Sequence, residues 1–124
     1  MAVIPASEAK VHELAGVRFT ALASPSRGSA ETSVWQVEVP VGAGPGTPHE
    51  LTREEVLVVV AGRAEVHLDG TSTEAGPGDT IVVPPHTPFA LGNVGDEPLR
   101  ALVCFPVGGE ARLDGATFVP PWAA

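Results

Sequence analysis

Apolar and polar residues alternate with a period of two along most of this chain, and glycine and proline interrupt the alternation every few residues. Within residues 33–40, Trp35 and Val37 lie on one face of the expected strand, and polar side chains alternate with them. A period of two is the pattern of a half-buried β-strand. The 14 Gly and 13 Pro have no fixed spacing, which excludes a collagen-like chain and favours short strands joined by tight turns.

The alternating segments predict at least seven strands and therefore an antiparallel sandwich or barrel. These strands are expected at residues 17–22, 33–40, 55–60, 63–68, 80–83, 89–91 and 99–105. The dipeptide Asp69-Gly70 is typical of a β-hairpin turn. Only residues 7–14 are compatible with a helix. Because no linker or internal repeat is visible in the 124 residues, we expect one domain over residues 1–124.

Charge and hydropathy restrict the partners of the chain. Fifteen acidic against seven basic residues give a net charge of −8, which argues against nucleic acid, because a nucleic-acid binder needs a basic face. The longest apolar run, residues 56–61, is far shorter than the roughly 20 residues that span a bilayer, so no membrane partner is expected. The start has no secretory signal pattern. A lone cysteine, Cys104, fits a reducing compartment and a place in the core. We expect a cytoplasmic protein.

Two segments contain chemically informative residues at a regular spacing. Residues 43–62 include His49, then Glu55 six positions later, then Gly62, and residues 78–93 begin with glycine, have proline six positions on and end with asparagine. This spacing resembles the paired motifs of the cupin family. The first family motif contains His-x-His, a glutamate and a closing glycine, and the second contains glycine, proline, histidine and asparagine. The resemblance implies an all-β fold with a single cupin-type β-barrel, a double-stranded jelly roll.

Two of the four positions that bind metal in cupins have changed. In metal-bearing members, two histidines and a glutamate of the first motif converge with one histidine of the second. Here Leu51 and Phe89 replace two of these histidines, which leaves His49 and Glu55. Two donors hold a first-row transition metal poorly, so no cofactor is expected. In an alternative, His86 completes a set with His49 and Glu55 that holds a divalent transition metal.

His49 and Glu55 are the candidate catalytic residues of a largely apolar cup. The resemblance directs Glu55 inward, and alternate residues of its strand share that side. Burial of a carboxyl group without a partner raises its pKa, which suits general acid or base catalysis. In another reading, Glu55 only anchors a loop through Thr52 or backbone amides. The side chains expected to contact a planar or cyclic ligand are Trp35, Val37, Leu51, Leu57, Phe89 and Leu91.

Three functions follow from this site. In the first, a metal-independent isomerase, cyclase or lyase moves a proton with Glu55 and His49. In the second, the same cup serves a non-catalytic binding or sensory protein. In the third, a metal-dependent oxygenase uses His49, Glu55 and His86.

The resemblance also implies a homodimer, and the apolar residues 118–122 support it. An exposed segment of this composition would form a sticky patch. We therefore expect residues 118–122 to pack on the barrel or on a neighbouring subunit.

Overall fold

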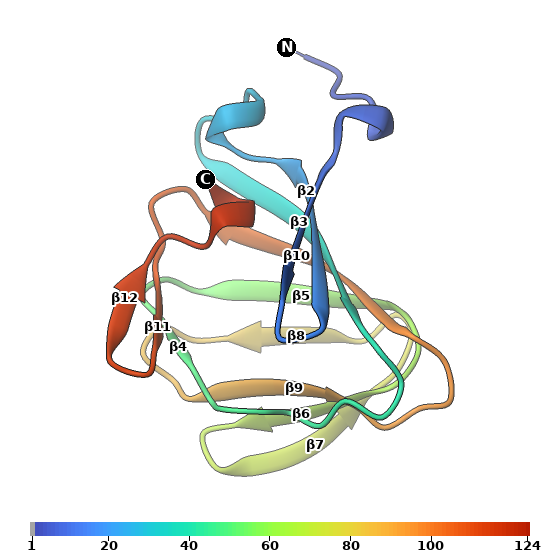
Figure 1. The fold of residues 1–124 in the computed structure, drawn as a ribbon. Coiled ribbons are helices and arrows are strands. Elements are labelled where there is room, and N and C mark those ends of the chain that lie inside the picture. Colours follow the sequence, from blue (N-terminus) through green and yellow to red (C-terminus); the bar gives the residue numbers. More distant parts are fainter. Residues whose placement is uncertain (1) are drawn as a thin grey trace.

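The computed structural model describes residues 2–124, which fold into β-strands with three short 3₁₀ helices (Figure 1). The strands are β1 (Lys10–Leu14), β2 (Val17–Ala23), β3 (Thr32–Val39), β4 (Glu50–Leu51), β5 (Glu55–Ala61), β6 (Ala64–Leu68), β7 (Thr71–Ala75), β8 (Thr80–Val83), β9 (Phe89–Asn93), β10 (Leu99–Pro106), β11 (Ala111–Leu113) and β12 (Ala116–Phe118). The helices are η1 (Ala6–Glu8), η2 (Pro25–Arg27) and η3 (Pro121–Ala123).

Two layers of antiparallel strands form the barrel (Figure 1). One layer is a six-stranded sheet in the order β1-β2-β3-β10-β5-β8, and the other contains the three-stranded sheets β12-β11-β4 and β7-β6-β9. The two smaller sheets meet where His49 pairs with Phe89 through reciprocal backbone hydrogen bonds of 2.9 and 2.8 Å. This arrangement confirms the expected all-β jelly roll. The hairpin expected at Asp69-Gly70 joins β6 to β7, and both residues have positive φ.

The core lies between the layers and follows the predicted alternation. Along β3, every second residue from Ser33 to Val39 is buried. Because paired strands keep their register, buried residues of neighbouring strands form rows across the sheet. One such row, from β3 through β10 and β5 to β8, contains Trp35, Val103, Leu57 and Ile81. Burial of each side chain of this size contributes about 1.5–3 kcal/mol relative to an exposed one, so these rows hold the layers together.

The helix expected at residues 7–14 is wrong. Only Ala6–Glu8 form a 3₁₀ turn, and Lys10–Leu14 form the edge strand β1. The cause is the turn that follows, where Ala15 and Gly16 have φ of 51° and 81°. Positive φ at both central residues is the geometry of a two-residue hairpin, which pairs β1 with β2 instead of allowing a helical turn.

The C-terminal segment packs on its own barrel. The Trp122 ring stacks on Phe19, with ring centroids 3.7 Å apart and planes 6° from parallel. The buried hydroxyl of Ser33 donates a 2.7 Å hydrogen bond to the carbonyl oxygen of Ala123. Helix η3 therefore contacts β1, β2 and β3, and Figure 1 shows it in red beside these strands. Residues 118–122 were expected to pack either on the barrel or on a neighbouring subunit. In the structure, this segment packs on the barrel.

Two residues of the motifs have structural roles. Gly62 has φ of 85°, and a Cβ atom there would lie 2.8 Å from the Cα of Leu99, so only glycine fits both the conformation and the space. The buried amide nitrogen of Asn93 donates to the carbonyl oxygens of Val39 and Glu97 at 3.1 and 2.9 Å. Asn93 therefore ties the end of β9 to β3 and to the loop before β10.

The core position expected for Cys104 is wrong, because its side chain is exposed. Along β10, Val103 and Phe105 point into the core, and the residue between them must face outward. No helix within residues 2–124 has the length and apolar character to cross a membrane.

Candidate functional site

The two motif segments pair with each other in both layers of the barrel. His49 and Phe89 exchange backbone hydrogen bonds, and the amide of His86 donates to the carbonyl oxygen of Leu51 at 2.7 Å. The first motif then continues into β5, where Glu55 is opposite Val83 of β8. This pairing places the two motif segments next to each other.

Glu55 is the first residue of β5 and faces the interior. Its exposed fraction is 6%. Within residues 2–124 its carboxyl group has neither a hydrogen-bond partner nor an ion pair. Loss of water on burial raises the pKa of Glu55 to about 8, because the charged form is poorly solvated there. At neutral pH this carboxyl group is therefore mostly protonated and can donate a proton.

The loop-anchoring role considered for Glu55 does not match the structure. The hydroxyl of Thr52 accepts a 2.8 Å hydrogen bond from the backbone amide of Glu110 instead. Thr52 thus fixes the loop before β5 to the residue that precedes β11. The Glu55 carboxyl group takes no part in that connection and remains free for another role.

His49 is half-buried at the entrance to β4. Its imidazole meets the Phe89 ring edge to face, with centroids 5.5 Å apart and planes at 62°. Burial lowers the pKa of His49 below its usual 6.5, because the imidazolium form also loses hydration. The imidazole forms no ion pair with Glu55 in the described part of the chain. At neutral pH the site therefore contains an uncharged acid and an uncharged base.

The apolar residues predicted to line the cup are part of the core. Leu91 is half-buried, and the other five are buried: Trp35, Val37, Leu51, Leu57 and Phe89. The Trp35 ring packs edge to face against Phe105 and Trp122, with centroid distances of 6.1 and 6.4 Å. The Trp35 ring therefore contacts the protein's own aromatic side chains.

Phe105 was missed as a neighbour of the candidate acid. Cys104 pairs with Val56, so the next position along each antiparallel strand brings Phe105 beside Glu55. The alternation of β10 could have predicted that Phe105 faces the interior, because Phe105 shares a face with Val103. The pairing of β10 with β5 was needed to place that face beside Glu55.

Two surface cavities are lined by other residues. Their volumes are about 210 and 270 Å³. Neither is lined by His49 or Glu55.

The residues present do not fit a tightly held metal ion. No group of three or more His, Cys, Asp or Glu within residues 2–124 is placed to hold one. His86, which would complete the alternative set, is exposed on the turn before β9 with φ of 58°. It does not join His49 and Glu55 in a cluster. At the remaining two positions, Leu51 and Phe89 provide hydrocarbon where a metal needs donor atoms.

Comparison with known proteins identifies relatives of this chain. The family model described as a cupin domain matches residues 35–105. An uncharacterized protein of Methanocaldococcus jannaschii is 38% identical over 72 residues, which are 58% of this chain and 58% of that protein. The match therefore spans less than two thirds of that relative.

Solved structures share the fold. The polyketide cyclase RemF from Streptomyces resistomycificus superposes with a TM-score of 0.78 and 21% identity, covering 92% of this chain and 85% of RemF. KdgF from Halomonas sp. gives 0.65 and 24%, covering 84% and 93%. Oxalate decarboxylase from Lactobacillus farciminis gives 0.69 and 26%, covering 82% of this chain but only 32% of the enzyme.

Proposed function

Because this chain belongs to the cupin family, we propose that it binds a small planar or cyclic organic molecule in the barrel and moves a proton on it. The observation that carries this proposal is the Glu55 carboxyl group, which is buried without a partner and has a pKa of about 8. Burial of an unpartnered carboxyl group costs stability. Groups with such shifts are concentrated at functional sites, and this one lies where the family places its chemistry.

The two neutral side chains define the direction of proton transfer. An imidazole nitrogen of His49 accepts a proton from an acidic C–H or O–H of the ligand, and the Glu55 carboxyl group donates its proton to a second atom of that ligand. The ligand leaves as an isomer of the same composition. The imidazolium and carboxylate that remain regain their neutral forms by proton exchange through water. General acid–base catalysis of this kind contributes about 10²–10⁴-fold.

The surroundings favour an uncharged ligand with a flat apolar body. Leu51 and Phe89 adjoin His49, and Phe105 adjoins Glu55, so a charged ligand would lose hydration without gaining an opposite charge. The structural similarity to a polyketide cyclase supports a cyclic or cyclising substrate.

Proton transfer can be tested with a ketone whose C–H bonds are acidic. We expect the protein to accelerate exchange of deuterium from D₂O into 2-tetralone, followed by NMR. Glu55→Gln should reduce the acceleration by about 10²-fold or more, whereas Glu54→Gln, which changes the exposed neighbouring acid, should leave it intact. Exchange by Glu55→Gln at the wild-type rate would rule out the catalytic role.

Two further measurements distinguish proton transfer from the two alternative functions. Thermal stabilisation by 2-tetralone without exchange would favour the non-catalytic binding or sensory protein. Dialysis against EDTA tests the metal-dependent oxygenase, because removal of a required ion would abolish activity. We expect exchange to survive dialysis.

We also propose that the chain forms a homodimer through the outer face of the six-stranded sheet. Four exposed apolar residues of β5, β8 and β10 lie on this face: Val58, Val60, Val82 and Leu102. The register supports their proximity, because Leu102 pairs with Val58. A two-fold axis brings the same apolar patch of two copies together, so a second copy would cover this face.

A further inference from the structure

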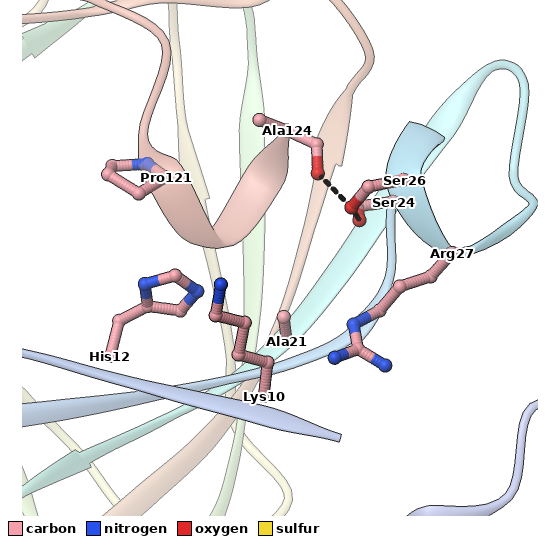
Figure 2. A pocket seen from close by; sticks show the side chains of 8 residues that line it. All are labelled: Lys10, His12, Ala21, Ser24, Ser26, Arg27, Pro121 and Ala124. Carbon is pink, nitrogen blue, oxygen red and sulfur yellow. Dashed lines mark hydrogen bonds between the residues drawn. The ribbon is translucent and has the colours of Figure 1, made fainter. Parts of the chain in front are cut away.

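A cavity with a different chemistry lies beside η3 and the C-terminal residue Ala124. It has a volume of about 210 Å³ and is bounded by β1, β2, η2 and η3. The lining residues are Lys10, His12, Ala21, Ser24, Ser26, Arg27, Pro121 and Ala124 (Figure 2). None of them belongs to the site of His49 and Glu55.

Basic side chains dominate the lining. Figure 2 shows the Lys10 ammonium group, the Arg27 guanidinium group and the His12 imidazole arranged around the same space. No Asp or Glu side chain lines the cavity, and the negative group in its lining is the terminal carboxylate of Ala124. This is a concentration of positive charge in a chain of net charge −8 that has only seven Lys and Arg residues.

Within residues 2–124, Lys10 and Arg27 belong with Arg53 and Arg112 to the cations that form no ion pair. Three arginines have a glutamate partner: Arg18 of β2, Arg63 of the turn between β5 and β6, and Arg100 of β10. The charges of Lys10 and Arg27 are therefore available to an anion in the cavity, where the partly enclosed setting strengthens the attraction relative to open solvent.

The lining is held in position by hydrogen bonds. The guanidinium group of Arg27 donates through Nη1 to the carbonyl oxygen of Glu8, which fixes its orientation and leaves other N–H groups free. The buried Ser24 hydroxyl is 3.1 Å from that of Ser26, which donates to the carbonyl oxygen of Ala124 at 2.7 Å. Donors already held in place lose less entropy when a ligand binds.

We propose that this cavity binds a small anion through a carboxylate or phosphate head group. Lys10 and Arg27 neutralise the charge, and the planar guanidinium group matches the paired oxygens of either head group. His12 supplies a ring nitrogen as a further donor. The volume is below the roughly 300–1,000 Å³ of pockets for drug-sized ligands, so the ligand contains only a few non-hydrogen atoms. Unlike the proposed barrel ligand, it is charged.

The proposal can be tested by titration of the full chain with sodium phosphate and with sodium succinate. Sodium chloride at matched ionic strength is the reference for each titration. We expect saturable NMR shifts of the amides of residues 10–12 and 24–27, and comparison of the two anions identifies the preferred head group. Shifts that follow ionic strength and do not saturate with either anion would overturn the proposal.

Variants test whether binding depends on Lys10 and Arg27 in particular or only on the overall charge of the chain. The double variant Lys10→Gln/Arg27→Gln should weaken binding at least tenfold. Arg112→Gln, which removes an exposed arginine of β11, should bind as the wild type does. Lys10→Arg keeps the charge and should retain binding, which also checks that the site folds. Equal affinity of the double variant and the wild type would contradict the proposal, whatever happens at Glu55.

Discussion

Burial shifts the pKa of Glu55 upward and that of His49 downward. Both shifts have the same cause, because each side chain loses water and neither forms an ion pair with the other. The carboxyl group therefore keeps its proton and the imidazole stays neutral over a common pH range. A pair of this kind can donate and accept protons without first separating charge.

The raised pKa of Glu55 links the stability of the fold to pH. Between pH 4.5, the ordinary pKa of a glutamate side chain, and about pH 8, the folded chain keeps a proton that the unfolded chain has released. Folding therefore takes up a proton, and the free energy of unfolding falls as pH rises through this range. Each pKa unit corresponds to about 1.4 kcal/mol, so the full effect amounts to a few kcal/mol.

We expect Glu55→Gln to reduce this decline and to be more stable than the wild type at pH 8.5. Urea unfolding at pH 7 and pH 8.5 measures the effect, with Glu54→Gln as the exposed control. Titration of His49 does not change the stability between pH 7 and pH 8.5. Its lowered pKa makes stability fall only as pH drops below about 6.5. An unchanged pH slope in Glu55→Gln would show that the carboxyl group is not protonated in the fold.

The sequence located Glu55 but not the environment that determines its chemistry. The resemblance to the cupin motifs placed Glu55 in the barrel and directed it inward. Its lack of a partner depends on Thr52, which bonds to Glu110, a residue 58 positions further along the chain. Tertiary contacts of this kind leave no local pattern.

At the scale of elements, long alternating strands were predictable and short ones were not. The eight residues of β3 alternate clearly and were expected almost to the residue. Strand β4 has two residues, and β11 and β12 have three each, which is too short to show a period. In β1, Val11 and Leu14 are three apart, as on a helix face. The hairpin with β2 determined its conformation instead.

The loop between β9 and β10 depends on one side chain. The Asn93 amide donates to two carbonyl oxygens, and its own oxygen accepts a 2.8 Å hydrogen bond from the amide of Gly95. We expect Asn93→Ala to lower the free energy of unfolding by about 2–4 kcal/mol, because buried polar groups lose their partners. Thr71→Ala, at an exposed position of β7, should change it by less than about 0.5 kcal/mol. Chemical denaturation that gave both variants the same stability would contradict this role.

At the scale of the whole molecule, the C-terminal segment no longer supports a dimer. Trp122 and Ala123 are buried against the chain's own strands. The outer face of the six-stranded sheet is instead the exposed apolar surface, since Val60 and Val82 are each about half exposed. A surface of this kind is typical of an interface.

We expect Val58→Lys to convert a dimer into a monomer, because a charge in the middle of this face would be buried without a partner. Light scattering coupled to size-exclusion chromatography measures the mass. Val41→Lys places the same charge on an exposed loop and should leave the dimer intact. A wild-type chain that is monomeric at micromolar concentration would overturn the proposed interface.

The outward position of Cys104 gives the molecule a built-in attachment point for spectroscopic reporters. It is the single thiol of the chain, it is exposed on β10, and its strand neighbour Leu102 lies on the same side of the sheet. A nitroxide or fluorophore can therefore be coupled there by maleimide chemistry without engineering a new cysteine. If two chains associate through that sheet, paired nitroxides would give a short dipolar distance, and slow coupling of the reagent would measure how well the partner shields the thiol.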